Sequence, residues 1–251
     1  HLDWFTAQDL LEERPSLLAF EDEQPVGILA CPPDPIGIGW IRYFAVSPGT
    51  PTVPVWESLW EQTLTLAPME QIVSISALVS QAWFIPILLG SGFIEQTEVI
   101  FLEWRGGQTM VNLPLHASLR TMSPADLEAV SAVDRIAFQP LWQHSLRALT
   151  SAYELSSLAT VIEVDQRVVA YQISTFSALG AHLARLAVEP SMQGQGLAKA
   201  LVTHALRHFE RRGTDRMSVN TQADNPRSHV LYEKLGFTPT GKRFPVLLYE
   251  F

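Results

Sequence analysis

The sequence predicts a mixed α and β fold, α/β in the broad sense, that is built twice along one chain. Strand-like and helix-like segments alternate without the strict order of a parallel βαβ protein. Short motifs of the first half recur in the second half at a nearly constant distance. A glycine-rich break at Arg105-Gly-Gly-Gln108 separates apolar strand-like runs, and we interpret it as a linker.

The repeat consists of matches that occur in the same order in both halves. Glu21-Asp-Glu-Gln-Pro-Val-Gly27 corresponds to Glu163-Val-Asp-Gln-Arg-Val-Val169, and Phe44-Ala-Val-Ser-Pro48 corresponds to Leu186-Ala-Val-Glu-Pro190, both 142 positions later. Gly92-Phe93 matches Gly236-Phe237 at a distance of 144 positions. An ordered series of matches at nearly one offset indicates duplication, and its period is the length of a domain rather than of a solenoid repeat.

Two domains follow from this repeat, residues 1–109 and residues 110–251. His1 projects by 142 positions onto Gln143, well inside the second copy. The first copy therefore lacks the counterpart of the first strand and helix, or the chain has been trimmed there.

Local signals predict the elements of the second copy in order. Ala117–Thr121 is expected to form a strand, and Ser123-Pro-Ala-Asp126 has the N-cap serine, the first-turn proline and the early acid of a helix start. Helical sequence runs to about Phe138 and again from about Leu141 to Tyr153. Three strands are predicted next, with a turn at Asp165-Gln166 between the first two: residues 159–163, 167–176 and 181–188.

A long amphipathic helix is predicted from Gly194 to Arg212. Leu197, Leu201, Ala205 and Phe209 recur every four residues along it, and Gly213 is suited to end it. The remaining predicted elements are a strand at 217–221, a short helix at 225–235 that Gly236 closes, and a last strand at 246–251.

Composition excludes several classes of protein. No apolar run approaches the roughly 20 residues of a membrane helix, so we expect no membrane partner. His1–Leu11 contains acids and no cationic leader, which argues against a secretory signal. The one cysteine, Cys31, permits no internal disulfide, is expected to be an inert core residue, and favours a cytoplasmic location.

The formal net charge of −9 is unevenly distributed. Residues 1–109 contain 3 Lys/Arg and 14 Asp/Glu, whereas residues 110–251 contain 14 and 12. An acidic first half argues against a nucleic-acid partner and is compatible with a cationic one. A solvated acidic surface that aids solubility is the alternative interpretation.

The segment Gln193-Gly-Gln-Gly-Leu-Ala198 joins a predicted strand to the start of the long helix. The first turn of a helix exposes unpaired N–H groups at the positive end of its dipole, and such groups bind phosphate. By itself a Gly-x-Gly is more often a plain turn. The dinucleotide fingerprint is not met, because Lys199 occupies the position of its third glycine.

A second motif lies downstream, Asn225-Pro-Arg-Ser-His-Val-Leu-Tyr-Glu-Lys-Leu-Gly-Phe237. Together with Leu186-Ala-Val188 and Gln193-x-x-Gly196-x-Ala198, in this order and spacing, it closely resembles the GNAT superfamily of N-acetyltransferases. The resemblance covers about residues 117–251. It implies two tandem GNAT-like domains, each a mixed, mostly antiparallel sheet flanked by helices, with acetyl-CoA as the donor substrate and no metal.

The resemblance also implies roles for individual residues. The backbone of Leu186, Ala187 and Val188 would hydrogen-bond the pantetheine arm like an added strand. Asn225 would hydrogen-bond the same arm, and Tyr232 would contact the departing CoA thiolate and protonate it as a general acid. The CoA pyrophosphate would be held by Lys199 and by the amides of Gln193, Gly194, Gln195, Gly196, Leu197 and Ala198.

The base that deprotonates the amine is less clearly marked. His182, in His182-Leu-x-x-Leu-Ala-Val188, resembles the catalytic histidine of the arylalkylamine branch, although Ala184 replaces the second histidine of that branch. A surface histidine at a strand end is the alternative. Ribosomal-protein acetyltransferases often have a glutamate where this chain has Asn220, which weakens the case for a peptide N-terminus as acceptor. Four aromatic residues line an acceptor cleft or, as the more common role, pack in the core: Phe138, Trp142, Tyr153 and Tyr171.

The first copy has lost the cofactor motifs. Gly196 projects onto Pro54, which has no N–H for a phosphate, and Ala198 projects onto Trp56. At the later offset, the positions of Asn225 and Tyr232 are taken by Gln81 and Leu88. We predict a first copy that keeps the fold, does not bind CoA, and shields a sheet edge or walls the acceptor cleft. In the second case its acidic surface would favour a cationic acceptor.

The sequence thus predicts direct transfer of an acetyl group from acetyl-CoA to a primary amine of a small molecule or peptide, without a covalent enzyme intermediate. A CoA-binding regulatory or scaffold module without catalysis is one alternative, and the retained Tyr232 argues against it. A transferase for a longer acyl group is another. His204 and His208 are four residues apart but lack a third ligand, so we expect no metal site.

Overall fold

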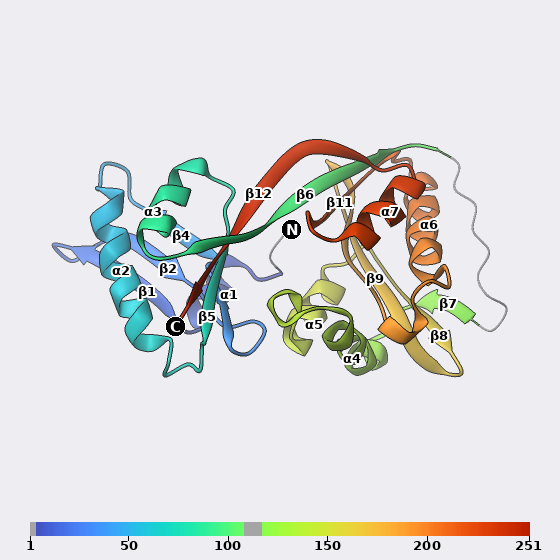
Figure 1. Cartoon of the computed structure of the whole chain (residues 1–251), viewed down its shortest axis with the longest axis horizontal. Helices are drawn as coiled ribbons and strands as arrows, with labels where there is room; N and C mark the ends of the chain where they lie inside the picture. Colours follow the sequence, from blue (N-terminus) through green and yellow to red (C-terminus); the bar gives the residue numbers. More distant parts are fainter. Residues whose placement is uncertain (1–3, 108–116) are drawn as a thin grey trace. The chain divides into compact units, whose positions relative to one another are not determined.

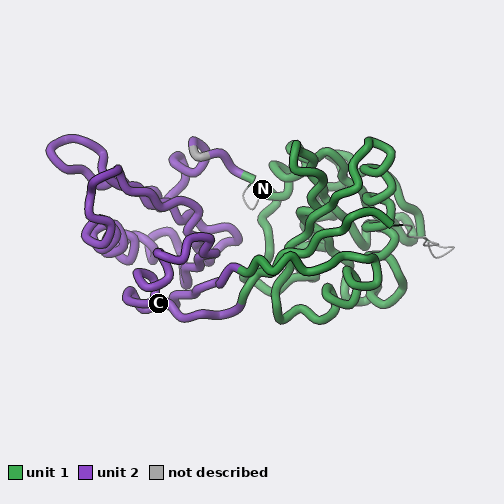
Figure 2. The backbone as a smooth tube through the Cα atoms, turned by 90° about the horizontal axis from the view of Figure 1, so that it is seen from above, with its two compact units in different colours: residues 1–4, 98–243 green, residues 5–97, 244–251 purple. Residues whose placement is uncertain are grey.

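The computed structural model describes residues 4–107 and 117–251, so Gln108 of the expected linker lies outside the described residues. The described residues form two compact units (Figure 2). Unit 1 contains residues 98–243 and Trp4, and unit 2 contains residues 5–97 and 244–251. In the parts of the chain that are described, no helix is long and apolar enough to cross a membrane.

Unit 1 is a sheet with helices on both faces (Figure 1). Its strands follow the order β6-β11-β10-β9-β8-β7, and every described pair is antiparallel except β10 with β11. Its elements in chain order are β6 (Ile94–Arg105, entering from unit 2), β7 (Ala117–Thr121), η2 (Pro124–Asp126), α4 (Leu127–Ala137), η3 (Pro140–Trp142), α5 (Leu146–Glu154), β8 (Leu158–Val164), β9 (Arg167–Ser177), β10 (Gly180–Val188), η4 (Pro190–Met192), α6 (Leu197–Glu210), β11 (Arg216–Gln222), α7 (Pro226–Lys234) and β12 (Thr238–Glu250, leaving for unit 2).

Helices α6 and α4 cover opposite faces of this sheet, because successive strand residues point to opposite sides. Ala170 of β9 packs in one apolar cluster with Leu201 of α6. The next residue, Tyr171, donates its hydroxyl to Asp134 of α4. On β10 and β11, Leu183 and Val219 likewise pack against α6. The residues that alternate with them therefore face the α4 side.

Unit 2 repeats part of this arrangement. One set of strands has the order β1-β2-β4, and β5 lies between β3 and the second half of β12. The core gathers around buried residues of the long helix α2. Its elements are α1 (Ala7–Glu12), β1 (Ser16–Glu21), β2 (Gln24–Ala30), β3 (Ile38–Trp40), β4 (Tyr43–Val46), α2 (Thr52–Leu66), β5 (Ser74–Leu78), η1 (Ala82–Phe84) and α3 (Ile85–Gly90).

Strand register supports the internal repeat. Gly39 of β3 pairs in parallel with Ile75 of β5 in unit 2. Ala181 of β10 pairs in parallel with Met217 of β11 in unit 1, and both residues lie 142 positions after their counterparts. The β-hairpin turns are offset by one more: Asp22-Glu23 and Asp165-Gln166 adopt positive φ and lie 143 positions apart.

The last strands of the two halves are exchanged. The second part of β6 pairs with β11 of unit 1, from Val99↔Gln222 to Arg105↔Arg216. The second part of β12 pairs with β5 of unit 2, from Val246↔Leu78 to Glu250↔Ser74. The boundaries between the compact units therefore lie inside β6 and β12. The domains 1–109 and 110–251 follow the sequence repeat instead, and they stay a prediction.

Two elements differ from the sequence-based expectation. The last strand, expected at 246–251, begins at Thr238, because its first half belongs to unit 1 and only its second half is the apolar run. The helix expected from about Leu141 to Tyr153 is instead a short 3-10 turn followed by α5, which begins after the N-cap residue Ser145. The Ser145 hydroxyl accepts the N–H of Ala148, so the helix restarts there.

Candidate active site

Strands β10 and β11 separate at the centre of unit 1. They pair in parallel only from Ala181↔Met217 to Leu183↔Val219. The register of β10 against β9 shifts between Leu183 and Arg185, which marks a β-bulge at Ala184. A bulge bends its strand and increases the local twist. Beyond it Leu186, Ala187 and Val188 pair with β9 on one side, and no described residue pairs with them on the other.

This free edge of β10 leads into the glycine turn that starts α6. Gly194 and Gly196 have φ values of +80° and +82°, a conformation that glycine adopts without a steric penalty. A Cβ built on either glycine would meet no atom within 4 Å, so the space above them is open. Gly196 is the N-cap of α6 and provides no side-chain cap for the first N–H groups of the helix. The turn thus has the features of an anion site.

The side chain of Gln193 connects the turn to its neighbours. Its Nε2 donates to the carbonyl oxygen of Val188 at 3.1 Å, and its Oε1 accepts a hydrogen bond from Arg227 of α7. The end of β10, the glycine turn and the start of α7 are therefore held together. The side chain of Gln193 is engaged in this support, and its backbone N–H donates to the carbonyl oxygen of Pro190 at 3.4 Å.

Helix α7 contains two of the predicted residues. Asn225 is its N-cap, and Oδ1 of Asn225 accepts the N–H of Ser228 at 3.2 Å. Tyr232 is 4% exposed and packs with Phe237 at a ring distance of 5.4 Å, and burial raises its pKa above the usual value. The raised pKa keeps the proton on the oxygen at neutral pH, and the hydroxyl makes no hydrogen bond within the described residues.

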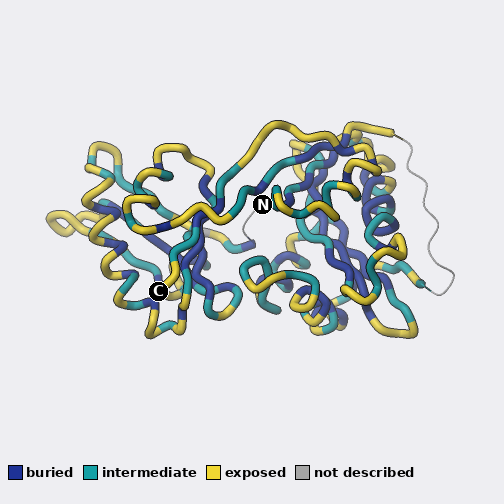
Figure 3. The backbone as a smooth tube through the Cα atoms, viewed as in Figure 1, coloured by how far each residue is buried: buried dark blue, intermediate teal, exposed yellow. Residues whose placement is uncertain are grey.

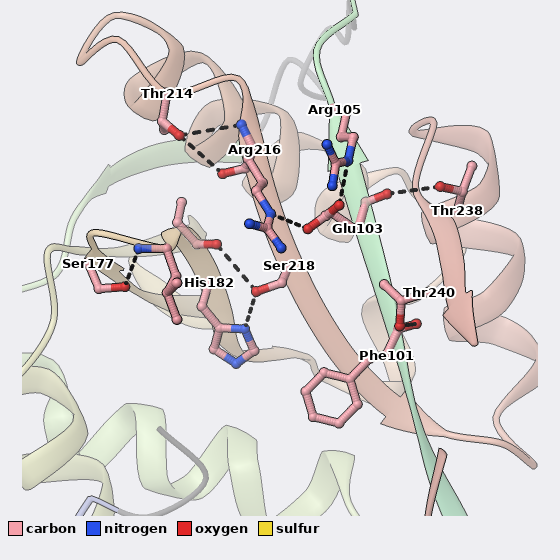
Figure 4. Close-up of polar contacts among 12 residues, drawn as sticks. Phe101, Glu103, Arg105, Ser177, His182, Thr214, Arg216, Ser218, Thr238 and Thr240 are labelled. Atoms are coloured by element: carbon pink, nitrogen blue, oxygen red, sulfur yellow. Dashed lines mark hydrogen bonds and ion pairs between the residues drawn. The ribbon is translucent and has the colours of Figure 1, made fainter. Parts of the chain in front are cut away.

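His182 lies in a row of polar residues on the α4 face of the sheet (Figure 4). Its register partner on β11 is Ser218, whose own partner on β6 is Glu103. Nδ1 of His182 lies 2.9 Å from Oγ of Ser218, and Glu103 forms ion pairs with Arg105 and Arg216. His182 is 7% exposed, so the alternative of a surface histidine is wrong.

Burial lowers the pKa of His182 from 6.5 to about 4. A hydrogen bond with the side chain of Asn220 acts in the opposite direction and favours the protonated ring. The ring is therefore neutral at pH 7 and has a nitrogen that can accept a proton. Asn220 occupies the position where ribosomal-protein acetyltransferases often have a glutamate. Its side chain forms a hydrogen bond with His182.

The four aromatic residues proposed for an acceptor cleft have different positions. Tyr171 is fully buried and hydrogen-bonded to Asp134, so it is a core residue. Phe138 and Trp142 are half-buried in the segment between α4 and α5, and Tyr153 is half-buried on α5. Phe138 and Trp142 contact Arg185 of β10.

Other titratable groups do not form a metal centre in the described parts of the chain. No group of three or more His, Cys, Asp or Glu side chains is placed to hold a metal ion there. Cys31 is fully buried in the apolar core of unit 2, and burial raises the pKa of its thiol to about 12. A thiol with this pKa is a poor nucleophile at neutral pH.

Unit 2 lacks the glycine turn. Helix α2 begins at Thr52, so Pro54, at the position of Gly196, lies inside its first turn. Trp56 takes the position of Ala198 and is 1% exposed. Its ring stacks on Trp60 at 5.4 Å, and its Nε1 donates to Ser91 at 2.7 Å. In the row that corresponds to His182, Ser218 and Glu103, unit 2 has Trp40, Ser76 and Leu248.

The comparisons with known proteins agree with this geometry. The model of the acetyltransferase (GNAT) family matches residues 127–237, a range that includes the free edge of β10, the glycine turn and α7. The chain contains a GNAT acetyltransferase domain. Its mixed α and β fold, predicted from the sequence, is confirmed.

Curated relatives match parts of this GNAT domain. The mycothiol acetyltransferase of Saccharomonospora viridis is 30% identical over 145 residues, which cover 50% of this chain and 47% of the relative. The [ribosomal protein bS18]-alanine N-acetyltransferase of Escherichia coli is 40% identical over 57 residues, covering 23% and 38%. The chain therefore matches less than half the length of these relatives.

Solved structures show that the fold extends beyond the GNAT domain. A tandem GNAT protein from the clavulanic acid biosynthesis pathway superposes with a TM-score of 0.64 at 15% identity, covering 95% of this chain and 84% of that one. A GCN5-related N-acetyltransferase from Sphaerobacter thermophilus gives a TM-score of 0.63 at 16% identity, covering 94% and 80%. At these identities the likeness concerns the fold alone, and it supports the tandem arrangement.

Sequence reasoning missed several polar residues of the GNAT domain. Ser218 looked like one residue of an ordinary strand, and its contact with His182 depends on the register of β10 and β11. Asp134 and Arg185 form a buried ion pair between α4 and β10. Their signal was present, because each is a lone charge within an apolar helix face or strand.

Proposed function

We propose that the GNAT domain transfers an acetyl group from acetyl-CoA to the primary amine of a small molecule or peptide by direct attack. The observation that carries this proposal is the free edge of β10 at Leu186–Val188, which leads directly into the uncapped, glycine-turned start of α6. The two features suit the two halves of one ligand, an amide-containing arm and a pyrophosphate.

The residues present fit the donor. An extended arm with amide groups can add to the β10 edge as a strand would, through the backbone of Leu186 to Val188. The N–H groups from Gly194 to Ala198, with Lys199, suit the pyrophosphate, because the glycine turn keeps open space above them. The N–H of Gln193, which the resemblance includes in this set, donates to Pro190 at 3.4 Å. Asn225 caps α7 through Oδ1 and donates one amide N–H to Oε1 of Gln222 at 3.4 Å, which leaves the second amide N–H for the arm.

Acetyl-CoA supplies an activated thioester carbonyl. The backbone N–H near Val188 would polarise the carbonyl oxygen, and binding beside the β10 edge would align the carbonyl with the amine. His182, neutral at pH 7, would accept the proton of the amine as the C–N bond forms, because the attacking nitrogen becomes strongly acidic at that point. Tyr232 would protonate the thiolate that leaves, since its buried hydroxyl keeps its proton.

The names of the relatives support an acetyltransferase and differ in the molecule that they mention. One group carries the name of mycothiol and the other that of an alanine of a ribosomal protein. Asn220 stands where the resemblance to ribosomal-protein acetyltransferases implies a glutamate. We therefore keep both a peptide and a small amine as proposed acceptors. We also propose that the protein acts in the cytoplasm.

Unit 2 is proposed to have a structural role. Pro54 lies within the first turn of α2, and the buried Trp56 fills the position next to it, so neither a free N–H cluster nor open space remains there. We expect one CoA site per chain.

Calorimetry with acetyl-CoA tests the proposal, with wild type compared to Gly196→Pro. Proline cannot adopt the φ of +82° at this N-cap, so the substitution should abolish binding. One site per chain that the variant loses supports the proposal, while no site or two sites contradict it. Release of CoA is then followed with three probe amines: 2-phenylethylamine, spermidine and an alanine-initiated hexapeptide. Binding without release would favour the alternative of a non-catalytic CoA-binding module.

A further inference from the structure

We infer that Arg185 and Asp134 are positioning residues that hold the segment 138–144 beside the reaction point and thereby set the affinity for the acceptor. This inference rests on the proposed acetyl transfer. It concerns the acceptor side, whereas the motifs described above concern the donor.

Asp134 is the centre of the network. It is 0% exposed, lies on α4, and accepts hydrogen bonds from three sources. Arg185 donates through Nε to Oδ2 at 2.8 Å and through Nη2 to Oδ1 at 2.9 Å, which is a bidentate pair. Tyr171 donates its hydroxyl, and the backbone N–H of His144 donates at 2.9 Å.

Arg185 makes two more contacts with the segment between α4 and α5. Its Nη2 donates to the carbonyl oxygen of Trp142 at 2.7 Å. Its guanidinium lies over the ring of Phe138, 3.6 Å from the ring centre. The segment is therefore fixed at its beginning, its middle and its end, at Phe138, Trp142 and His144. These contacts also explain why the helix expected from about Leu141 is interrupted before Ser145.

The β-bulge of β10 gives Arg185 this orientation. Leu183 and Leu186 both pack against the α6 side of the sheet, although three positions separate them. The extra residue at the bulge allows His182 and Arg185 both to face the α4 side. One strand thus presents the proposed base, then the residue that holds the segment, and then the cofactor edge from Leu186.

Stability alone is a weak reason for such a pair. Two charges removed from water gain little or nothing over apolar side chains of similar volume, so stability does not account for this pair. Here the pair holds a segment whose half-buried Phe138 and Trp142 contact Arg185, which faces the same side of the sheet as His182. An amine that approaches His182 and the thioester on this side would be bounded by that segment.

The decisive comparison replaces both charges at once, in the double variant Asp134→Leu/Arg185→Met, because an apolar pair leaves no uncompensated charge. We expect its thermal midpoint to fall modestly, because the hydroxyl of Tyr171 and the N–H of His144 lose their acceptor, and its acetyl-CoA Kd to stay close to wild type. Hydrogen exchange of residues 138–144 should become faster. KM for the probe amine should rise roughly 10- to 100-fold while KM for acetyl-CoA changes little. Arg120→Met is the matched control, since Arg120 also pairs with two carboxylates of this unit, Asp126 and Glu163.

The outcomes separate this inference from the proposed function. Unchanged exchange in segment 138–144 and an unchanged acceptor KM would overturn the inference, even if acetyl transfer is confirmed. If the double variant does not fold, Arg185→Lys decides, because lysine keeps the charge beside Asp134 but lacks the fork that also reaches Trp142. An intermediate rise in acceptor KM and exchange supports the inference, and wild-type values overturn it. If the wild-type protein does not bind acetyl-CoA, the proposed function is contradicted. The hydrogen-exchange measurement still tests whether Arg185 and Asp134 hold residues 138–144 in place.

Discussion

Oγ of Ser218 lies 2.9 Å from Nδ1 of His182, across the parallel strands β11 and β10. The same hydroxyl lies 3.4 Å from the carbonyl oxygen of Ala181, to which it donates its proton. With its hydrogen directed at that carbonyl, the hydroxyl oxygen can accept a hydrogen bond from Nδ1–H of His182, which would make Nε2 the basic nitrogen. The register of the two strands brings this hydroxyl and the ring together, and we predict that the contact selects the tautomer of His182.

Ser218→Ala should remove this selection. We expect kcat to fall about tenfold or more, because general-base catalysis depends on the correct tautomer, with KM for acetyl-CoA unchanged. The ¹⁵N shifts of the imidazole report the tautomer directly. Ser76→Ala is the matched control, since Ser76 holds the equivalent register in unit 2 and its buried hydroxyl has no partner within the described residues. Equal kcat values for the two variants would contradict the assignment.

The lowered pKa of His182 predicts an acid-sensitive fold. Because the folded value is about 4 and the ordinary value is 6.5, the unfolded chain binds more protons between these pH values. The contribution of His182 to the free energy of unfolding is therefore fully present above about pH 6.5. It is lost as the pH falls toward 4, a change of roughly 3 kcal/mol. Denaturant unfolding across pH 4–7 measures it, and His182→Gln should flatten the profile. An equally steep profile in that variant would assign the effect to other groups.

Gly196→Ala should weaken acetyl-CoA binding more than it weakens the fold. An alanine at a φ of +82° costs about 1 kcal/mol, and its methyl group would occupy the open space where the pyrophosphate is proposed to bind. Gly213→Ala is a close control, because Gly213 follows the other end of α6 with a φ of +86° and equally open space. Thermal midpoints should match, while calorimetry should find weaker binding in Gly196→Ala alone. Equal affinities would exclude the turn as the anion site.

Two tyrosines that are both buried should respond differently to loss of the hydroxyl. Tyr171→Phe removes a hydrogen bond to the buried Asp134 and should destabilise the protein by about 1–3 kcal/mol. Tyr232→Phe removes a hydroxyl without a described protein partner, so we expect stability close to wild type and a kcat about 100-fold lower. Chemical denaturation and CoA release measure the two effects. Full activity in Tyr232→Phe would exclude it as the general acid.

The sequence by itself determined the repeated fold and the donor motifs. Its evidence was local, since glycines that require positive φ, the apolar period of α6 and the α7 motif all lie within short segments. The offset of 142 positions also predicted which residues of unit 2 replace the glycine turn, and Pro54 and Trp56 lie where the repeat places them.

Only the tertiary structure decided the pairings that join distant segments. The exchange of β6 and β12 depends on which sheet edge each strand meets, and hydrophobic patterns do not encode that choice. The contacts of His182 with Ser218, and of Arg185 with Asp134, join residues 36 and 51 positions apart. They arise from strand register and from one bulge at Ala184, because a shift of one residue would turn each side chain to the other face of the sheet.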